Sequence, residues 1–164
     1  MKFKLVKLKQ LSGNKASIYT VFFDDYQKTS LEIFINENIN VFLSEIKDIY
    51  LRLKVIGTKA GVREQYFRLN EGNPGDGVCA LYDKPNSALR LYCIRYGSLI
   101  LIAGGGGPKT VQKLQQNKKL KDENEFLRNL SIRITERIRN NEIWFSDDNM
   151  DFEGNLTFND QGNE

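Results

Sequence analysis

The chain has 164 residues, a formal net charge of +3 and no histidine. A chain of this length can bury a hydrophobic core as one domain without disulfides or a metal ion. The absence of histidine excludes Ser-His-Asp and Cys-His catalysis and histidine-ligated metal sites, which leaves acid–base chemistry to Lys, Arg, Tyr, Asp or Glu. We expect neither a cofactor nor a metal site.

The N-terminal third predicts two strands followed by helices. Residues 2–9 mix lysines with apolar side chains, and residues 16–23 are rich in β-branched and aromatic side chains, as strands are. Thr29 and Glu32 have the spacing of a capping box, which predicts a short helix or turn over 31–37. The next helix is amphipathic, with apolar residues at steps of three and four until a glycine ends it. These apolar residues are Ile39, Phe42, Ile46, Ile49, Leu53 and Ile56.

Several features bear on the compartment. The N-terminus, MKFKLVKLKQL, lacks the unbroken apolar core of a signal peptide, and no apolar run approaches the roughly 20 residues of a membrane span. Cys79 and Cys93 provide neither a disulfide framework nor the spacing of a metal site, and their apolar neighbours predict buried thiols. We therefore expect a cytoplasmic protein without a membrane partner.

The middle of the chain predicts three strands after a loop. Residues 70–77 (NEGNPGDG) have loop composition, whereas the mixed segment 59–69 allows no assignment. Gly97 and Ser98 fit a two-residue hairpin turn between the second and third strands. The three strands are predicted over residues 78–82, 88–96 and 99–103.

The remaining segments add one helix. Four consecutive glycines, residues 104–107, predict either a flexible turn or the close approach of a partner. Residues 110–117 fit a helical turn or an exposed arm. A second amphipathic helix follows, whose apolar face we expect in the core and whose arginines we expect in solvent. Its apolar positions are Phe126 or Leu127, Leu130, Ile134 and Ile138.

The order of these elements predicts an α+β fold. Strands joined by short connections favour a small antiparallel or mixed sheet over repeated βαβ units. We expect this sheet to pack against the N-terminal helices, with an extra N-terminal strand and an added C-terminal helix. Residues 1–140 form this single domain in our assignment.

Residues 141–164 are assigned to an acidic tail. All 24 basic residues lie in residues 1–140 beside 14 of the 21 acids, so this part carries +10 and the tail carries −7. A basic body favours a polyanionic partner, with solubility as the alternative explanation of the charge. We expect the tail to be partly disordered. One hypothesis is that the tail, anchored by Trp144 and Phe145, docks on the basic body and competes with RNA.

The glycine-rich segment resembles a Walker A loop only superficially. That motif is G-x-x-x-x-G-K-[ST], and its two glycine positions are Ala103 and Pro108 here. A proline removes one of the backbone amides that would hold the phosphates. The preceding strand also belongs to a predicted antiparallel hairpin, so an NTPase site is not expected.

Residues 89–110 (LRLYCIRYGSLILIAGGGGPKT) carry the most informative pattern. Alternation along the first strand places Arg90, Tyr92 and Ile94 on one face, and Arg95 on the other unless a bulge intervenes. Cations and an aromatic ring on a rigid sheet suit a phosphodiester backbone. An ion pair between Arg90 and Asp83 across the hairpin is an equally plausible role for this arginine on sequence alone.

This segment resembles the C-terminal sheet of RelE/ParE-superfamily toxins, especially their HigB-like and phage-derived branch. The resemblance rests on Leu89-Arg90-Leu91-Tyr92, the turn, the apolar strand over 99–102 and the Lys-Thr pair, and it extends less sharply over residues 15–115. Members are mostly ribosome-dependent mRNA endonucleases, and one branch targets DNA gyrase. The resemblance therefore implies a toxin of a type II toxin–antitoxin system, with a cognate antitoxin protein and the mRNA or ribosome as partners.

The resemblance also implies roles for particular residues. Arg90 matches the arginine of the family's strand and would stabilise the phosphate, and Lys109 would contact the phosphate or transfer a proton. Tyr92 completes the candidate catalytic set. The expected RNA-binding residues are Lys84, Arg95, Thr110 and Lys113.

The sequence also departs from the family pattern. The strand over 78–82 has no cation before Lys84, and Pro108-Lys109 has one cation fewer than the usual basic pair. The histidine or second aromatic residue found near the end of relatives is absent. The alternative function is therefore a catalytically weak module of the same fold that binds protein or nucleic acid.

Overall fold

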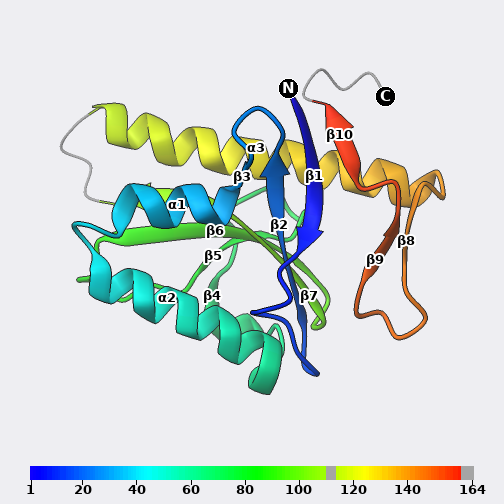
Figure 1. Cartoon of the computed structure of the whole chain (residues 1–164), viewed down its shortest axis with the longest axis horizontal. Coiled ribbons are helices and arrows are strands. Elements are labelled where there is room, and N and C mark those ends of the chain that lie inside the picture. Colours follow the sequence, from blue (N-terminus) through cyan, green and yellow to red (C-terminus); the bar gives the residue numbers. More distant parts are fainter. Residues whose placement is uncertain (110–113, 160–164) are drawn as a thin grey trace.

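A computed structural model describes residues 1–109 and 114–159, except for the side chains of residues 114–117. The fold has three layers (Figure 1). The helices α1 (Ser30–Asn38) and α2 (Leu43–Val55) cover one face of a sheet, and the long helix α3 (Leu114–Arg139) covers the other. The chain is therefore of the mixed α+β class, with a helix on the second face of the sheet as well.

The main sheet has eight strands, seven of them in the order β10-β1-β2-β7-β6-β5-β4, with β3 paired to β2. The neighbours β2 and β7 run parallel, and the other pairs are antiparallel. The strand bounds are β1 (Lys2–Lys7), β2 (Ser17–Phe23), β3 (Lys28–Thr29), β4 (Phe67–Arg68), β5 (Val78–Leu81), β6 (Leu89–Tyr96), β7 (Ile100–Pro108) and β10 (Thr157–Asn159). All five strands expected from the sequence are present at their expected places.

Each face of the sheet has its own core, as the period of two in strands requires. Leu91 and Cys93 of β6 pack with α1 and α2, whereas Tyr92 and Ile94 pack with α3. Leu127 of α3 is fully buried. The alternation predicted for β6 is therefore confirmed, and the apolar face of the C-terminal helix is in the core.

The helices follow their sequence signals in part: the capping box is present, but α2 begins at Leu43 rather than at Ile39, and Arg137 of α3, which we expected in solvent, is buried. The hydroxyl of Thr29 accepts the backbone N–H of Glu32, and the Glu32 carboxylate accepts the backbone N–H of Thr29, which completes the capping box. After α2 the chain continues as a π-helical turn, η1 (Ile56–Ala60). The unassigned segment that follows holds the 3-10 turn η2 (Glu64–Tyr66) and the short edge strand β4.

The four glycines do not form a loop, which corrects one expectation. They extend β7, and a bulge lies in β7 because Leu91 pairs with Gly106 while Cys93 pairs with Ala103. A Cβ at Gly104 would lie 2.7 Å from the side chain of Leu127, and one at Gly106 would overlap the carbonyl oxygen of Arg90. Close approach is therefore the reason for glycine at positions 104 and 106, and the neighbours are α3 and β6 of the same chain.

The described part of the acidic tail, residues 141–159, contains three strands. Two strands, β8 (Ile143–Phe145) and β9 (Phe152–Gly154), form a hairpin, and β10 pairs with β1. Buried Phe152 and Phe158 anchor this region, whereas Trp144 is 51% exposed. Trp144 is therefore not the anchor that we expected. The short apolar runs in residues 141–159 are too weak a pattern to predict these three strands.

The described part of the tail lies away from the candidate site. Asp151 forms an ion pair with Lys7 at 2.8 Å, and the ring of Phe152 contacts that of Tyr96 at the end of β6. Arg90 lies at the start of the same strand. Figure 1 shows the β8–β9 hairpin at the opposite end of the molecule from the beginning of α3. The tail residues up to Asn159 therefore do not cover Arg90.

No helix among the described residues combines the length and the apolar character that crossing a bilayer requires.

Candidate functional site

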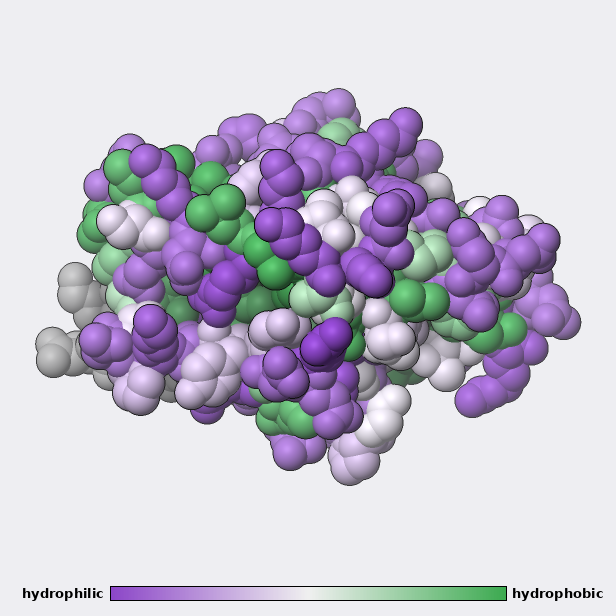
Figure 2. All heavy atoms as spheres, turned by 90° about the horizontal axis from the view of Figure 1, so that it is seen from below, coloured by the Kyte–Doolittle hydropathy of each residue, from purple (hydrophilic) through white to green (hydrophobic). Residues whose placement is uncertain are grey.

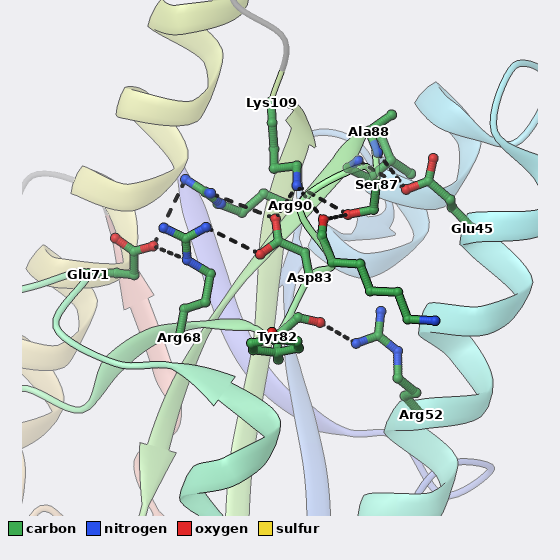
Figure 3. Close-up of polar contacts among 12 residues, drawn as sticks. Glu45, Arg52, Arg68, Glu71, Tyr82, Asp83, Ser87, Ala88, Arg90 and Lys109 are labelled. Carbon is green, nitrogen blue, oxygen red and sulfur yellow. Dashed lines mark hydrogen bonds and ion pairs between the residues drawn. The ribbon is translucent and has the colours of Figure 1, made fainter.

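Three cations from different strands meet at one end of the sheet (Figure 3). Arg90 comes from β6, Lys109 follows the last residue of β7, and Arg68 ends β4. They surround Asp83, which follows β5 on the turn that leads to β6. Because β7, β6, β5 and β4 are neighbours in the sheet, residues far apart in the sequence come together here.

Asp83 forms ion pairs with all three cations. Its Oδ2 atom lies 2.7 Å from Nζ of Lys109 and 3.7 Å from a terminal guanidinium nitrogen of Arg90. Its Oδ1 atom accepts a hydrogen bond from Arg68 at 3.4 Å. The Asp83 side chain is only 4% exposed, so a buried carboxylate lies at the centre of the cations.

Glu71 provides a second carboxylate to the same cluster. Its Oε1 atom lies 3.5 Å from Nε of Arg68 and 3.9 Å from a terminal nitrogen of Arg90. We call these five residues the Asp83 cluster: Arg68, Glu71, Asp83, Arg90 and Lys109. With three cations and two carboxylates, the cluster has a formal charge of +1.

Lys109 is held by more than its ion pair. Its ammonium group donates hydrogen bonds to the carbonyl oxygen of Lys84 and to the hydroxyl of Ser87, both at 3.1 Å. Its backbone N–H donates to the carbonyl of Ala88 at 2.6 Å. The turn from Asp83 to Ala88 therefore fixes the end of β7 from both the main chain and the side chain.

The cations keep Asp83 ionised. Burial on its own raises the pKa of this carboxyl, but the hydrogen bond and charge of Lys109, followed by the charges of Arg90 and Arg68, outweigh it and hold the pKa below 3.8. Asp83 is therefore a weak base at neutral pH. Asp83 is itself the anion around which these three cations gather.

Tyr92 does not face an open site. Its side chain is buried under α3, on the same face of the sheet as Arg90. Burial raises the pKa of its phenol above 10.0. The hydroxyl is thus poorly placed to transfer protons at neutral pH, and Tyr92 serves as core packing beside the cluster.

Of the four expected RNA-binding residues, Arg95 and Lys84 lie in the described part of the chain. Arg95 lies on the other face of the sheet, where its guanidinium is 5.9 Å from the ring centre of Phe67. Lys84 is exposed on the turn, and its carbonyl holds Lys109. Thr110 and Lys113 lie outside the described residues. The structure therefore brings together Arg90 and Lys109, and separates Arg95 from them.

Sequence reasoning missed Arg68 and Glu71. Arg68 belongs to the mixed segment that allowed no assignment, and Glu71 to a stretch with loop composition. The pairing of Phe67 with Leu81 and of Arg68 with Ala80 puts β4 beside β5. A two-residue strand has no detectable period, so the sequence offered no signal for this placement.

Displacement of Asp83 would leave the three cations of the cluster without their common anion. Three cations on a rigid sheet would then face one phosphate group and stabilise its negative charge. The described residues include no group of three or more His, Cys, Asp and Glu side chains arranged to hold a metal ion. The side chains of the cluster offer cationic stabilisation of an anion, with Glu71 as the carboxylate outside the centre of the cations.

Comparison with known proteins gives no family for the chain: no family model, no curated protein and no solved structure matches it.

Proposed function

We propose that this chain is the toxin component of a toxin–antitoxin pair, with a RelE-like fold, and that it acts on RNA at the Asp83 cluster. The observation that carries the proposal is the convergence of Arg68, Arg90 and Lys109 on the carboxylate of Asp83. Two of these cations are the residues that the resemblance to RelE-like toxins selects. The third comes from a separate strand and completes a binding site for a phosphate.

The order of elements supports the fold part of the proposal. Strand β2 is followed by α1 and α2 and then by β5, β6 and β7, which is the strand–helix–strand order of the resemblance. In the sheet, β7 lies between β2 and β6. In this proposal, β1, α3 and the strands β8 to β10 are additions to the RelE-like unit.

The proposed reaction is cleavage of RNA by its own 2′-hydroxyl group. Glu71, the carboxylate that does not lie at the centre of the cations, accepts the 2′-hydroxyl proton, and the oxygen attacks the adjacent phosphorus. Arg68 and Arg90 stabilise the five-coordinate phosphate, and the ammonium of Lys109 gives a proton to the departing 5′ oxygen. The P–O5′ bond breaks, which leaves a 2′,3′-cyclic phosphate and a 5′-hydroxyl.

A second candidate function is favoured by one specific observation. Asp83 is buried among the three cations, with its Oδ2 atom 2.7 Å from Lys109, so an internal carboxylate competes with any phosphate. Tyr92, the third candidate catalytic residue, is covered by α3. A module that binds RNA or protein without cleaving RNA fits these two facts.

Controlled expression in bacteria separates the two candidates. Growth and mRNA integrity are followed for the wild type, Arg90→Ala and Lys109→Ala, with circular dichroism of each purified protein as the check on folding. The proposal predicts growth arrest with mRNA cleavage by the wild type, and relief by either substitution in folded protein. Normal growth with intact mRNA under a well-expressed wild type would contradict the nuclease and leave the binding module.

The antitoxin partner is tested in the same strain. If an adjacent gene encodes a small helix-turn-helix protein and that protein is the antitoxin, we expect its co-expression to restore growth. Continued arrest with both proteins present would reject that neighbour as the antitoxin.

A further inference from the structure

A groove of about 680 Å³ lies between α2 and the turn that carries Asp83. One wall is α2 and the other is the segment from Tyr82 to Ser87, with Gln65 and Tyr66 at one end. Figure 2 views the molecule from the α2 side, where apolar side chains lie recessed between hydrophilic ones. The buried side chains of Ile49 and Leu81 line the groove.

Aromatic rings and cations line this groove together. Tyr82 is 50% exposed, although a large aromatic side chain contributes most to the stability of the folded protein when it is buried. Tyr66 is half-buried and lies at the same groove. The cations are Arg52, from α2, and Lys84, from the opposite wall. Rings beside cations are the combination that single-stranded nucleic acids bind, because bases stack on the rings and phosphates pair with the cations.

The carboxylates of the groove are already occupied. Glu45 accepts the backbone N–H groups of Ala88 and Leu89, at 2.8 and 3.2 Å. Asp48 accepts a hydrogen bond from Nε of Arg52 at 3.0 Å. These interactions reduce the repulsion that a phosphate would meet.

Arg52 is positioned rather than free. Besides its contact with Asp48, its guanidinium donates to the carbonyl oxygen of Tyr82 across the groove (Figure 3). This hydrogen bond ties α2 to the residue that carries the exposed ring. The groove is thus preformed, because α2 and the main chain at Tyr82 are held together across it.

The groove and the Asp83 cluster share one turn. Tyr82 and Lys84 line the groove, whereas Asp83, between them, points into the cluster. Ser87 lines the groove and also accepts a hydrogen bond from Lys109. If a phosphate of an RNA strand lies among the cations of the Asp83 cluster, the adjoining nucleotides lie beside the groove.

We infer that this groove is a base-binding site for single-stranded RNA, in which Tyr82 stacks on one nucleotide while Arg52 and Lys84 contact its flanking phosphates. The inference rests on the proposed function and deepens it, because it names the part of the RNA that the protein holds beside the cluster. It gives the exposed ring of Tyr82 a role that packing does not supply. It also predicts tolerance of different bases, since every base has a face that can stack.

The test is the affinity for a labelled single-stranded oligouridylate of about twelve nucleotides, measured by fluorescence anisotropy. The variants are Tyr82→Ala and Tyr82→Phe, with Tyr26→Ala as the matched control. Tyr26 is 57% exposed and does not line the groove. We expect Tyr82→Ala to weaken binding about tenfold, and we expect Tyr82→Phe and Tyr26→Ala to bind as the wild type does.

The outcomes separate the inference from the proposed function. Wild-type affinity in folded Tyr82→Ala, together with weaker binding by Arg90→Gln, would overturn the groove and leave the cluster as the RNA site. Equal losses in Tyr82→Ala and Tyr26→Ala would also overturn it, because the effect would not be local. No binding by the wild type would overturn both.

Discussion

The carboxylate of Asp83 and the ammonium of Lys109 lie 2.7 Å apart, one on the turn after β5 and the other at the end of β7. This contact ties the end of β7 to the turn after β5, because the same turn also accepts two more hydrogen bonds from the Lys109 side chain. It also neutralises one of the cations that a phosphate would need. The pair is therefore both a structural link and a competitor for the proposed ligand.

Asp83→Asn is expected to strengthen RNA binding severalfold while it lowers stability. Removing the central charge leaves three cations for the phosphate, and the folded protein loses about 2–4 kcal/mol because those cations lose a buried partner. Anisotropy with labelled RNA measures the first effect, and urea unfolding measures the second.

Asp147→Asn is the matched control for this variant. It makes the same change in net charge on the exposed turn between β8 and β9. If both variants gain the same affinity, net charge explains the gain and competition by Asp83 is wrong.

The pH dependence of stability should report the same carboxylate. Folding lowers the pKa of Asp83 from 3.8. Below about pH 5 the unfolded state therefore binds more protons than the folded state, and the free energy of unfolding decreases as the pH is lowered. The stabilisation is complete above about pH 5 and is lost as the pH falls through the folded value, below 3.8. The difference in unfolding free energy between the wild type and Asp83→Asn should therefore be largest above about pH 5 and become smaller as the pH falls below 3.8. A constant difference would contradict the pKa shift.

Two glycines of β7 should respond very differently to alanine. A Cβ at Gly106 would overlap the carbonyl oxygen of Arg90, whereas one at Gly107 would meet its nearest neighbour, Lys119, at 3.4 Å. We expect Gly106→Ala to cost more than about 3 kcal/mol, because two strand backbones must separate, and Gly107→Ala to cost less than about 1 kcal/mol. Thermal or urea unfolding decides this, and equal losses would reject the proposed close approach.

The two thiols should be inert in the folded protein. Burial raises the pKa of Cys79 to about 12, and burial also raises the pKa of Cys93 well above its usual value. Both thiols are buried, and neither is in a disulfide. We expect a thiol reagent at pH 8 to label neither residue until denaturant is added. Rapid labelling of the native protein would show that the β5–β6 region opens readily.

The elements with strong local signals could be predicted from the sequence. The capping box at Thr29, the alternation along β6 and the apolar positions of α3 each follow from a local rule, and the structure agrees with all three. Their common feature is that the signal and the structure lie within a few residues of each other.

The elements that depend on distant contacts could not be predicted in this way. Residues 104–107 have the composition of a loop, but β6 and α3 hold them in a strand. The tail has the charge of a disordered segment, but burial of Phe158 and pairing with β1 order its described part. In both places tertiary packing outweighs local preference.

The candidate site shows the same division. The sequence pattern selected Arg90 and Lys109 and named Asp83 as a possible partner of Arg90, and the three side chains meet. Arg68 and Glu71 joined them through a two-residue strand and a loop, which no local pattern marks. That Asp83 also pairs with Arg68 and Lys109 became apparent only from the distances.

The most direct measurement is the affinity of the wild type and Lys109→Gln for the same labelled RNA over a series of salt concentrations. Lys59→Gln, which removes an exposed lysine from η1, is the control. The account predicts that Lys109→Gln binds about tenfold more weakly, with a salt dependence reduced by about one ion, while Lys59→Gln stays close to the wild type. A folded wild type that does not bind RNA, or a Lys109→Gln that binds equally well, would contradict it.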